Sequence, residues 1–276
     1  MRVILHIGAH RCATTTFQHY LRANADRLAG QGVGVWLPPR TRRGLFSGII
    51  PTKSSPDPIT SAERARGRIR LNLAKSAERG VTTLIVSEEN IMGTMGEISR
   101  LGQLYPAAGE RVARYRDAFG DALTDVVLNL RSQHTFWPSV LAYGLGRGRA
   151  LPGAALLDRI ATAARGWREV AEDVACAAPG VRLHLLPFER YAGRPEAQFA
   201  EITGLDGPAT HARERRNAGP SREELRAVLP EIGEGQDRWQ PFAPDQIARL
   251  RAAYADDMAW LTDGGLRFVE NEVTLL

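Results

Sequence analysis

The sequence predicts an α/β fold in which a mainly parallel central sheet is flanked by helices. Four apolar runs, at residues 2–7, 82–87, 125–130 and 181–186, have the nearly continuous apolar character of strands buried on both faces. Segments with helical periodicity separate these runs, and alternating strands and helices favour parallel pairing. The chain has 276 residues, enough for one large core, and no change of composition marks a boundary. We therefore expect a single domain over residues 1–276.

Helices are expected to connect these strands. The first of them carries Phe17, Tyr20 and Leu21 on one face, as expected of a helix that packs on a sheet. A further strand is expected at residues 32–37, and Pro138 is expected to interrupt one of the later helices. The predicted helices cover residues 14–28, 61–79, 107–119, 134–145, 156–175, 195–203, 222–229 and 244–260.

Two segments between these elements are expected to be irregular. Residues 38–60 are rich in Pro, Gly, Ser and basic residues, and loops of this length in compact domains are usually functional. Residues 209–220, here called the basic segment, combine arginines with turn-forming residues. Ser221 and Glu224 follow with the spacing of a capping box, which predicts a helix start after the basic segment.

The composition favours a cytoplasmic protein with an anionic small ligand. No apolar run approaches the roughly 20 residues of a membrane span, and the apolar stretch at the start is too short for a signal peptide. Cys12 and Cys176 are expected to be reduced. The net charge is +5, but no basic stripe carries interleaved aromatic residues, so nucleic acid is not an expected partner. No Cys/His cluster has metal-ligand spacing, so no metal is expected.

The opening segment HIGAHRCATTTFQ predicts an anion-binding site. A strand, a turn containing Gly8 and a helix beginning near Thr14 bring free backbone N–H groups and the positive end of a helix to one loop. Thr14, Thr15 and Thr16 add hydroxyl groups. Arg11 adds a permanent charge with several donors.

Three common phosphate-binding motifs do not fit this segment. In the loop of nucleoside triphosphatases, counted from Gly8, Thr14 stands where the essential Lys is required. A tyrosine-phosphatase loop requires Arg six residues after its Cys, but Gln18 stands six residues after Cys12. The glycine fingerprint of dinucleotide-binding folds is also missing. Hydrolysis of ATP or GTP is therefore not expected.

The same segment resembles the 5′-phosphosulfate loop of sulfotransferases that use 3′-phosphoadenosine 5′-phosphosulfate (PAPS). Arg11 matches the basic position of that loop, Cys12 the Thr or Ser position, and Ala13 the Gly position, while Thr14 and Thr15 match the hydroxyl pair. Cys12 and Ala13 depart from the family pattern, and Ala13 adds a methyl group where the backbone approaches phosphate. The resemblance implies a three-layer P-loop-type fold, with the cofactor bound by the loop and the first helical turn.

A second resemblance to these sulfotransferases lies in VVLNLRSQHTFWPSVLAY. In the family, a strand ends in Arg and a Ser follows eight residues later, and both bind the 3′-phosphate of the cofactor. Arg131 and Ser139 stand at these positions, with Tyr143 placed as in the family's helix. Arg131 would be delivered to the crevice at the carboxyl ends of the strands, where it can grip phosphate with two donors. The alternative is that Arg131 and Ser139 are ordinary surface residues.

The basic segment resembles the late loop that closes over the nucleotide in the same family. The candidates there for contacting the 3′-phosphate or the adenine are Arg215, Arg216 and Asn217. The alternative is a solvated basic turn that precedes a capped helix.

The catalytic base is expected in TLIVSEENIMG, where the resembling family places His or Glu. Glu88 and Glu89 follow a buried strand at its carboxyl end, and Glu89 is favoured because it shares a side with Ser87 if the chain stays extended. Burial near a crevice can raise the pKa of a carboxylate toward working pH. Alternatively, Glu88 caps a helix or forms an ion pair. His134 is a rival base.

The resemblance implies transfer of a sulfuryl group from PAPS to an acceptor hydroxyl or amine, without a metal. Arg11 would stabilise the leaving oxygen. Residues 40–60 and 144–151 are expected to shape the acceptor pocket, and the acceptor class stays open between a small molecule, a glycan and a lipid. The alternatives are a non-catalytic nucleotide-binding P-loop protein and an ATP-dependent P-loop kinase.

Overall fold

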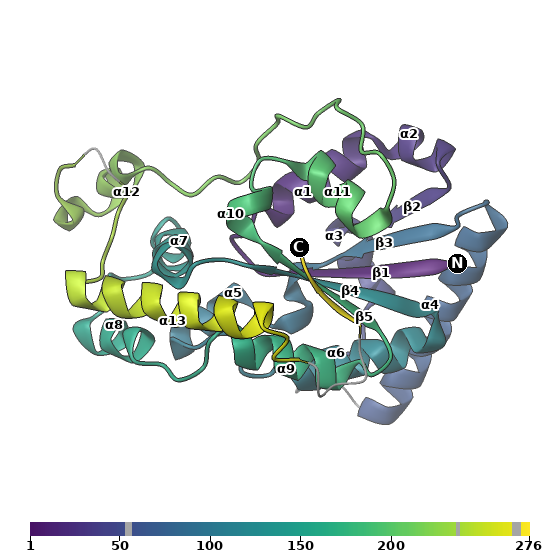
Figure 1. The fold of residues 1–276 in the computed structure, drawn as a ribbon, viewed down its shortest axis with the longest axis horizontal. Coiled ribbons are helices and arrows are strands. Elements are labelled where there is room, and N and C mark those ends of the chain that lie inside the picture. The colour runs from purple at the N-terminus through teal and green to yellow at the C-terminus, as the bar shows by residue number, and fades with distance from the viewer. Residues whose placement is uncertain (53–56, 236–237, 267–271) are drawn as a thin grey trace.

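The computed structural model describes residues 1–52, 57–235, 238–266 and 272–276, and its centre is one six-stranded sheet (Figure 1). The strand order is β2-β3-β1-β4-β5-β6, and all five neighbouring pairs are parallel. This confirms the predicted α/β class. The strands are β1 (Arg2–Gly8), β2 (Val33–Trp36), β3 (Thr83–Ser87), β4 (Leu123–Leu130), β5 (Arg182–Pro187) and β6 (Val273–Leu275).

Helices cover both faces of the sheet (Figure 1). Ile4 of β1 lies in one buried cluster with Phe17 and Phe199, whereas Leu5 lies in another with Ile69 and Val112. This division follows from strand geometry, because successive side chains point to opposite faces. The helices of the first face are α1 (Thr14–Ala23), α2 (Ala25–Gly30) and α11 (Pro195–Thr203), and those of the second are α4 (Pro58–Glu78), α6 (Ala108–Phe119) and α9 (Trp167–Ala177).

The remaining helices are short or lie beyond the sheet. They are α3 (Pro38–Arg40), α5 (Met95–Leu101), α7 (Gln133–Leu145), α8 (Ala154–Ala161), α10 (Phe188–Tyr191), α12 (Arg222–Val228) and α13 (Pro244–Thr262), with four further turns of helix, η1 (Thr41–Leu45), η2 (Glu89–Met92), η3 (Gly120–Ala122) and η4 (Pro230–Ile232). None of the helices in the described ranges combines the length and the apolar character that a bilayer-spanning segment needs.

Two predicted helices are each divided in the structure. The helix expected at residues 14–28 is α1 followed by α2, and they meet at Asn24, whose side-chain amide donates to the carbonyls of Tyr20 (3.1 Å) and Thr210 (2.9 Å). The helix expected at residues 156–175 is α8 followed by α9, separated by residues 162–166, of which Gly166 is extended. Apolar periodicity continues across both breaks, so the sequence pattern does not reveal them.

Pro138 does not interrupt its helix, contrary to expectation. It lies within α7, where a proline leaves the carbonyl four residues earlier without its helical donor. That carbonyl belongs to His134, and it accepts a hydrogen bond from the side-chain amide of Gln240 (3.3 Å) instead. The compensating donor lies 106 residues away in sequence.

The predicted long loop at residues 38–60 is partly helical. It contains α3 and η1 and ends where α4 begins at Pro58. Asp57 caps α4 by accepting from the backbone N–H groups of Ile59 and Thr60 (both 3.1 Å). Residues 53–56 of this predicted loop lie outside the described residues.

Two elements elsewhere in the chain, the helix α5 and the strand β6, were not predicted.

A buried carboxylate ties three strands together at the amino-terminal end of the sheet. Asp125 of β4 accepts hydrogen bonds from Arg2 of β1 (2.6 and 2.8 Å) and from Arg182 and His184 of β5 (3.2 and 2.8 Å). Burial alone would raise the pKa of Asp125, but these hydrogen bonds, with one from Thr124, outweigh it and lower the pKa.

Replacing Asp125 by Asn is expected to destabilise the fold by about 3–5 kcal/mol, because it leaves buried donors and a guanidinium without their carboxylate. The measurement is urea unfolding. Since the pKa of Asp125 is lowered on folding, its contribution is present above the unfolded pKa of about 4 and is lost as the pH falls below it. The wild-type protein should therefore lose part of its advantage over the variant below about pH 4. Equal stability at pH 7 would contradict this assignment.

The topology opens a crevice between the carboxyl ends of β1 and β4. The chain leaves β1 toward β2 on one side of the sheet and leaves β4 toward β5 on the other, although β1 and β4 are neighbours. Ligands of open α/β sheets bind at such a reversal, because the two connecting loops diverge there. The loops that follow β1 and β4 carry Arg11 and Arg131.

Candidate functional site

The loop after β1 adopts a conformation suited to an anion. Gly8 has φ +84°, and a Cβ atom there would lie 3.1 Å from Cβ of Glu89, so this position requires glycine. Arg11 and Ala13 also have left-handed backbones, with φ 59° and 61°. Ala13 precedes α1, and no side chain caps that helix. The backbone N–H groups of the first helical turn are therefore available to a ligand.

The left-handed conformation of Ala13 is costly for a residue with a Cβ atom, by about 1–2 kcal/mol. The resembling loop has glycine here, which would avoid this cost. Ala13 lines the cavity described next, so its methyl group is one of the surfaces that a ligand meets.

A cavity of about 180 Å³ lies against this loop. The loop and α1 form one wall, α7 and the segment after β4 form another, and the basic segment closes over it, with Arg238 and Phe188 at the margin. No acidic residue of the described chain lines it, whereas five arginines do. The predicted cofactor residues among its lining are Arg11, Ala13, Thr14, Thr15, Thr16, Arg131, Ser139, Arg216 and Asn217.

Arg131 is a buried wall of this cavity. Only 6% of the residue is exposed, and its guanidinium lies 4.3 Å from the centre of the Phe188 ring. Nη1 donates to the carbonyl of Arg11 (2.6 Å), and Nε donates to the hydroxyl of Thr135 (3.1 Å). Its Nη2 has no hydrogen-bond partner among the described residues. Arg131 therefore holds the loop after β1 in place, and its Nη2 group is available to a ligand in the cavity.

Arg11 reaches across the cavity from the loop. Its Nε donates to the hydroxyl of Ser139 (3.0 Å), and Nη1 donates to the carbonyl of Asn217 (3.3 Å). Its guanidinium also lies 5.3 Å from the centre of the Tyr143 ring. Arg11 thus joins the three walls of the cavity, which belong to distant parts of the sequence.

Neither Arg11 nor Arg131 forms an ion pair with a carboxylate of the described chain. Burial lowers the pKa of both guanidinium groups, and for Arg11 the charge of Arg131 lowers it further. Two neighbouring cations, one buried and one half-buried, without a carboxylate counter-ion among the described residues are unfavourable, and a bound anion would relieve this cost. The electrostatics of the cavity therefore favour a ligand with negative charge.

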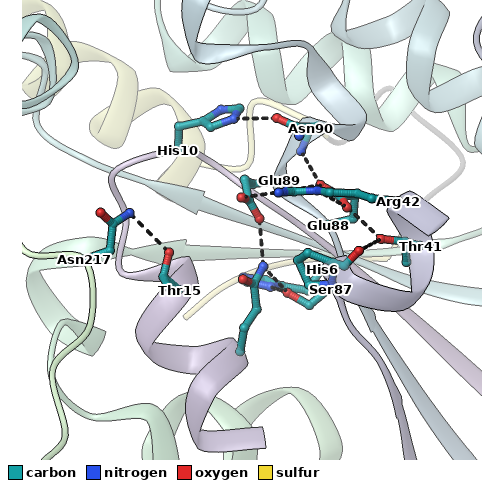
Figure 2. Close-up of polar contacts among 12 residues, drawn as sticks. His6, His10, Thr15, Thr41, Arg42, Ser87, Glu88, Glu89, Asn90 and Asn217 are labelled. Carbon is teal, nitrogen blue, oxygen red and sulfur yellow. Dashed lines mark hydrogen bonds and ion pairs between the residues drawn. The ribbon is translucent and has the colours of Figure 1, made fainter. Parts of the chain in front are cut away.

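The basic segment docks on the first turn of α1. The backbone N–H of Arg216 donates to the hydroxyl of Thr16 (3.0 Å), and the Asn217 amide donates to the hydroxyl of Thr15 (3.4 Å; Figure 2). Asn217 has a left-handed backbone with φ 52°. Arg215 and Arg216 both line the cavity, so this segment supplies two of its five arginines.

Cys12 lies apart from the other residues of its loop. Its side chain belongs to the buried apolar cluster below the loop and does not line the cavity. Burial raises the pKa of its thiol to about 12, so the thiol stays protonated at neutral pH. In this structure a ligand in the cavity would not meet its sulfur.

Glu88 has a structural role. Its carboxylate is buried and accepts hydrogen bonds from Arg42 (2.6 Å to Nη2), from the hydroxyl of Thr41 (2.7 Å) and from the backbone N–H of Asn90 (3.1 Å). The last bond caps η2. This confirms the alternative interpretation of Glu88 as a helix cap and ion-pair partner.

Glu89 lies beside the loop after β1, in the first turn of η2. One carboxylate oxygen accepts from Gln18 (2.7 Å) and the other from Arg42 (2.9 Å); Figure 2 shows Arg42 between the two glutamates. Burial would raise the pKa of Glu89, but the Gln18 bond and Arg42 outweigh it and lower the pKa. Although β3 ends at Ser87, Glu88 stays extended, and Gln18 Nε2 bonds to both Ser87 and Glu89, so these two side chains lie on the same side as expected.

A buried polar network continues from Gln18 into the sheet. Gln18 also donates to the hydroxyl of Ser87 (3.2 Å), which bonds to Nδ1 of His6 (2.7 Å), and Nε2 of His6 bonds to Asn129 (2.7 Å). Burial lowers the pKa of His6 to about 4, so the ring is neutral at neutral pH. This network fixes Gln18, which in turn orients Glu89.

His134, the rival base, does not line the cavity. Its Nδ1 bonds to the hydroxyl of Ser132 (2.7 Å), and burial lowers the pKa of the ring.

The two segments predicted to shape the acceptor pocket contact different parts of the structure. Arg42 of the first approaches Glu89, whereas Arg149 and Leu151 of the second line a different hollow.

The sequence analysis did not identify three residues of the candidate site. Gln18 and Arg42 contact Glu89, and Arg238 lines the cavity. Arg42 lies in a segment that was expected to be irregular and to shape the acceptor pocket, without being singled out itself, and Gln18 was considered only as a mismatch to a phosphatase motif. Gln18 and Arg42 belong to no recognisable sequence motif, because each contacts Glu89 from more than 40 residues away in the sequence.

Comparisons with protein-family models, with curated proteins and with solved structures found no match to this chain.

Proposed function

We propose that the protein is a PAPS-dependent sulfotransferase with a P-loop-type three-layer fold, which moves a sulfuryl group to an acceptor hydroxyl or amine. The observation that carries this proposal is that two arginines, the buried Arg131 and the half-buried Arg11, line one cavity without a carboxylate partner among the described residues. They follow neighbouring strands at the crevice where α/β sheets bind ligands.

Different residues of the cavity can bind the two charged ends of PAPS. The uncapped first turn of α1, with Thr14 and Thr15, suits the phosphosulfate, because backbone N–H groups and the helix dipole favour negative charge there. Arg131, whose Nη2 has no partner in the described part of the chain, and Ser139 suit the 3′-phosphate. PAPS supplies the sulfuryl group and leaves as 3′,5′-adenosine bisphosphate.

Two residues can serve the transfer itself. Glu89 is ionised and lies against Gly8, so it can take the proton from the acceptor O–H or N–H as the new bond to sulfur forms. The bond from sulfur to the 5′-phosphate oxygen breaks in the same step, and negative charge develops on that oxygen. Arg11 can stabilise this charge, an effect that typically lowers such a barrier by about 3–4 kcal/mol.

A non-catalytic nucleotide-binding protein is the second candidate. It is favoured by the engagement of both oxygens of Glu89 and by the methyl group of Ala13 at the position of the family's glycine. A P-loop kinase is less well supported, because Thr14 occupies the lysine position and no carboxylate of the described chain lines the cavity to hold Mg²⁺.

The test is thermal unfolding with 3′,5′-adenosine bisphosphate, compared with AMP and with ATP plus Mg²⁺. At 100 times its Kd, a ligand of the native state stabilises by about 2.7 kcal/mol, which is readily measured. We expect a large rise in Tm for the bisphosphate and little for AMP. Equal shifts for the bisphosphate and AMP would contradict a site for two phosphates, and a shift with ATP alone would favour the kinase.

Arg42→Gln is expected to move the acidic limb of the kcat profile to higher pH. Arg42 lowers the pKa of Glu89, so its removal raises that pKa and the base becomes protonated at a higher pH than in the wild-type protein. The measurement is release of 3′,5′-adenosine bisphosphate from PAPS with a set of hydroxyl and amine acceptors. Arg43→Gln is the matched control, because Arg43 is also exposed but forms no hydrogen bond or ion pair with Glu89 in the described chain. Identical acidic limbs for the two variants would exclude Glu89 as the titrating base.

A further inference from the structure

A cluster of potential metal ligands lies on the outer side of α1, where the basic segment folds back over the helix. His19 of α1 meets His211 and Glu214 of the basic segment. Nε2 of His19 is 2.7 Å from one carboxylate oxygen of Glu214, and Nδ1 of His211 is 2.5 Å from the other. One ligand atom of each side chain lies within 4.8 Å of the others.

The chemistry of this set matches a borderline divalent ion. Two imidazole nitrogens and one carboxylate oxygen are ligands that Zn²⁺ accepts, and three protein ligands leave a position open to water. The three side chains are 14%, 37% and 41% exposed, so an ion can enter from solvent.

A protein cation already occupies part of this cluster. Nη2 of Arg216 lies 3.1 Å from the Glu214 carboxylate and 3.4 Å from Nε2 of His19. Nη2 of Arg22 lies 3.3 Å from the other nitrogen of His19. The guanidinium of Arg216 therefore supplies a positive charge where a bound metal ion would lie. A metal ion and Arg216 must compete for the carboxylate of Glu214.

We propose that His19, His211 and Glu214 form a Zn²⁺ site whose occupation frees Arg216 from Glu214. Arg216 also lines the cavity between the loop after β1 and α7, so the freed guanidinium would lie at the edge of that cavity. The ion would also fasten the basic segment to α1, beside the bonds from Arg216 to Thr16 and from Asn217 to Thr15. The metal site stands independently of the proposed transferase activity.

The experiment is a calorimetric titration of the full chain with Zn²⁺. It uses a Cys176→Ser background, since Cys176 is an exposed free thiol and thiolates are zinc ligands. We expect one bound ion, with affinity falling at least about 100-fold in His211→Ala and in Glu214→Gln, because loss of even a supporting group typically costs about 10–100-fold. His134→Ala, which removes an imidazole outside the cluster, should bind zinc as the background does. Mg²⁺, which prefers six oxygen ligands, should not bind.

Arg216→Gln separates a metal site from a simple ion-pair network. Removing the competing guanidinium should tighten zinc binding about fivefold, in line with the strength of an exposed ion pair. Weaker binding in Arg216→Gln would overturn the proposed competition. Absence of zinc binding by the background protein, or equal binding by His211→Ala and the background, would overturn the site itself. Circular dichroism of each variant establishes that it is folded.

Discussion

Arg131→Ala is expected to weaken binding of 3′,5′-adenosine bisphosphate by about 100-fold and to remove the preference of the protein for this ligand over AMP. Truncating one partner of a desolvated charge pair costs about 2–5 kcal/mol, and each 1.4 kcal/mol is a factor of ten. Arg131 is 6% exposed, and its Nη2 bonds to none of the described residues, so its contact with phosphate would be made away from bulk water. Isothermal titration calorimetry with both ligands measures the effect.

Arg131 also braces the loop after β1, so a control must separate this role from ligand binding. Arg131→Lys keeps the charge but loses the forked geometry, and it is expected to retain part of the selectivity. Thr135→Val removes the hydroxyl that holds Nε while keeping the guanidinium, and it should affect binding much less. Unchanged preference for the bisphosphate in Arg131→Ala would show that the 3′-phosphate lies elsewhere, and the two-phosphate site would have to be abandoned.

The sequence allowed a good prediction of the sheet and of the crevice. Strands such as β3 and β4 are nearly continuous apolar runs, and this pattern arises because both of their faces are buried. A helix beginning at Thr14 followed from the glycine turn and the threonines. Once parallel strands were expected, Arg11 and Arg131 followed as residues at one edge of the sheet. The structure brings both to a single cavity.

The features that escaped prediction depend on contacts between distant segments. The division of α8 from α9 involves the backbone N–H of Trp167, which donates to Asp257 (2.7 Å), 90 residues later. The continuity of α7 through Pro138 depends on Gln240. The cluster of His19, His211 and Glu214 is only partly local, because His211 and Glu214 are three residues apart whereas His19 comes from α1, far away in sequence. Motif spacing detects metal ligands only where they are close in sequence.

Contacts with distant segments also explain why the sequence does not distinguish the structural settings of Glu88 and Glu89. Glu88 and Glu89 are adjacent and chemically identical, and only their partners differ. Thr41 and Arg42 enclose Glu88, whereas Gln18 orients Glu89 next to the loop after β1. Their separate roles therefore depend on how residues 41–45 fold back over the end of β3. Mutating each glutamate distinguishes the two roles experimentally.

Glu89→Gln is expected to lower kcat by about 10²–10⁴-fold, the usual contribution of a general base, while leaving the affinity for 3′,5′-adenosine bisphosphate unchanged. Affinity should be preserved because Glu89 does not line the cavity. Release of the bisphosphate from PAPS, measured with a set of hydroxyl and amine acceptors, gives kcat, and calorimetry gives the affinity. If sulfuryl transfer requires a base at this position, the amide cannot replace the carboxylate.

Glu88→Gln is the matched control, and it should act on the fold instead. Its carboxylate is buried against Arg42, and breaking such a pair typically costs about 3–5 kcal/mol of stability. We expect a larger fall in Tm for Glu88→Gln than for Glu89→Gln, because the side chain of Glu88 is 4% exposed and that of Glu89 is 15% exposed. Full activity in Glu89→Gln, together with loss of activity in a folded Glu88→Gln, would assign the base to Glu88. Full activity in both variants would exclude a glutamate base and return His134 to consideration.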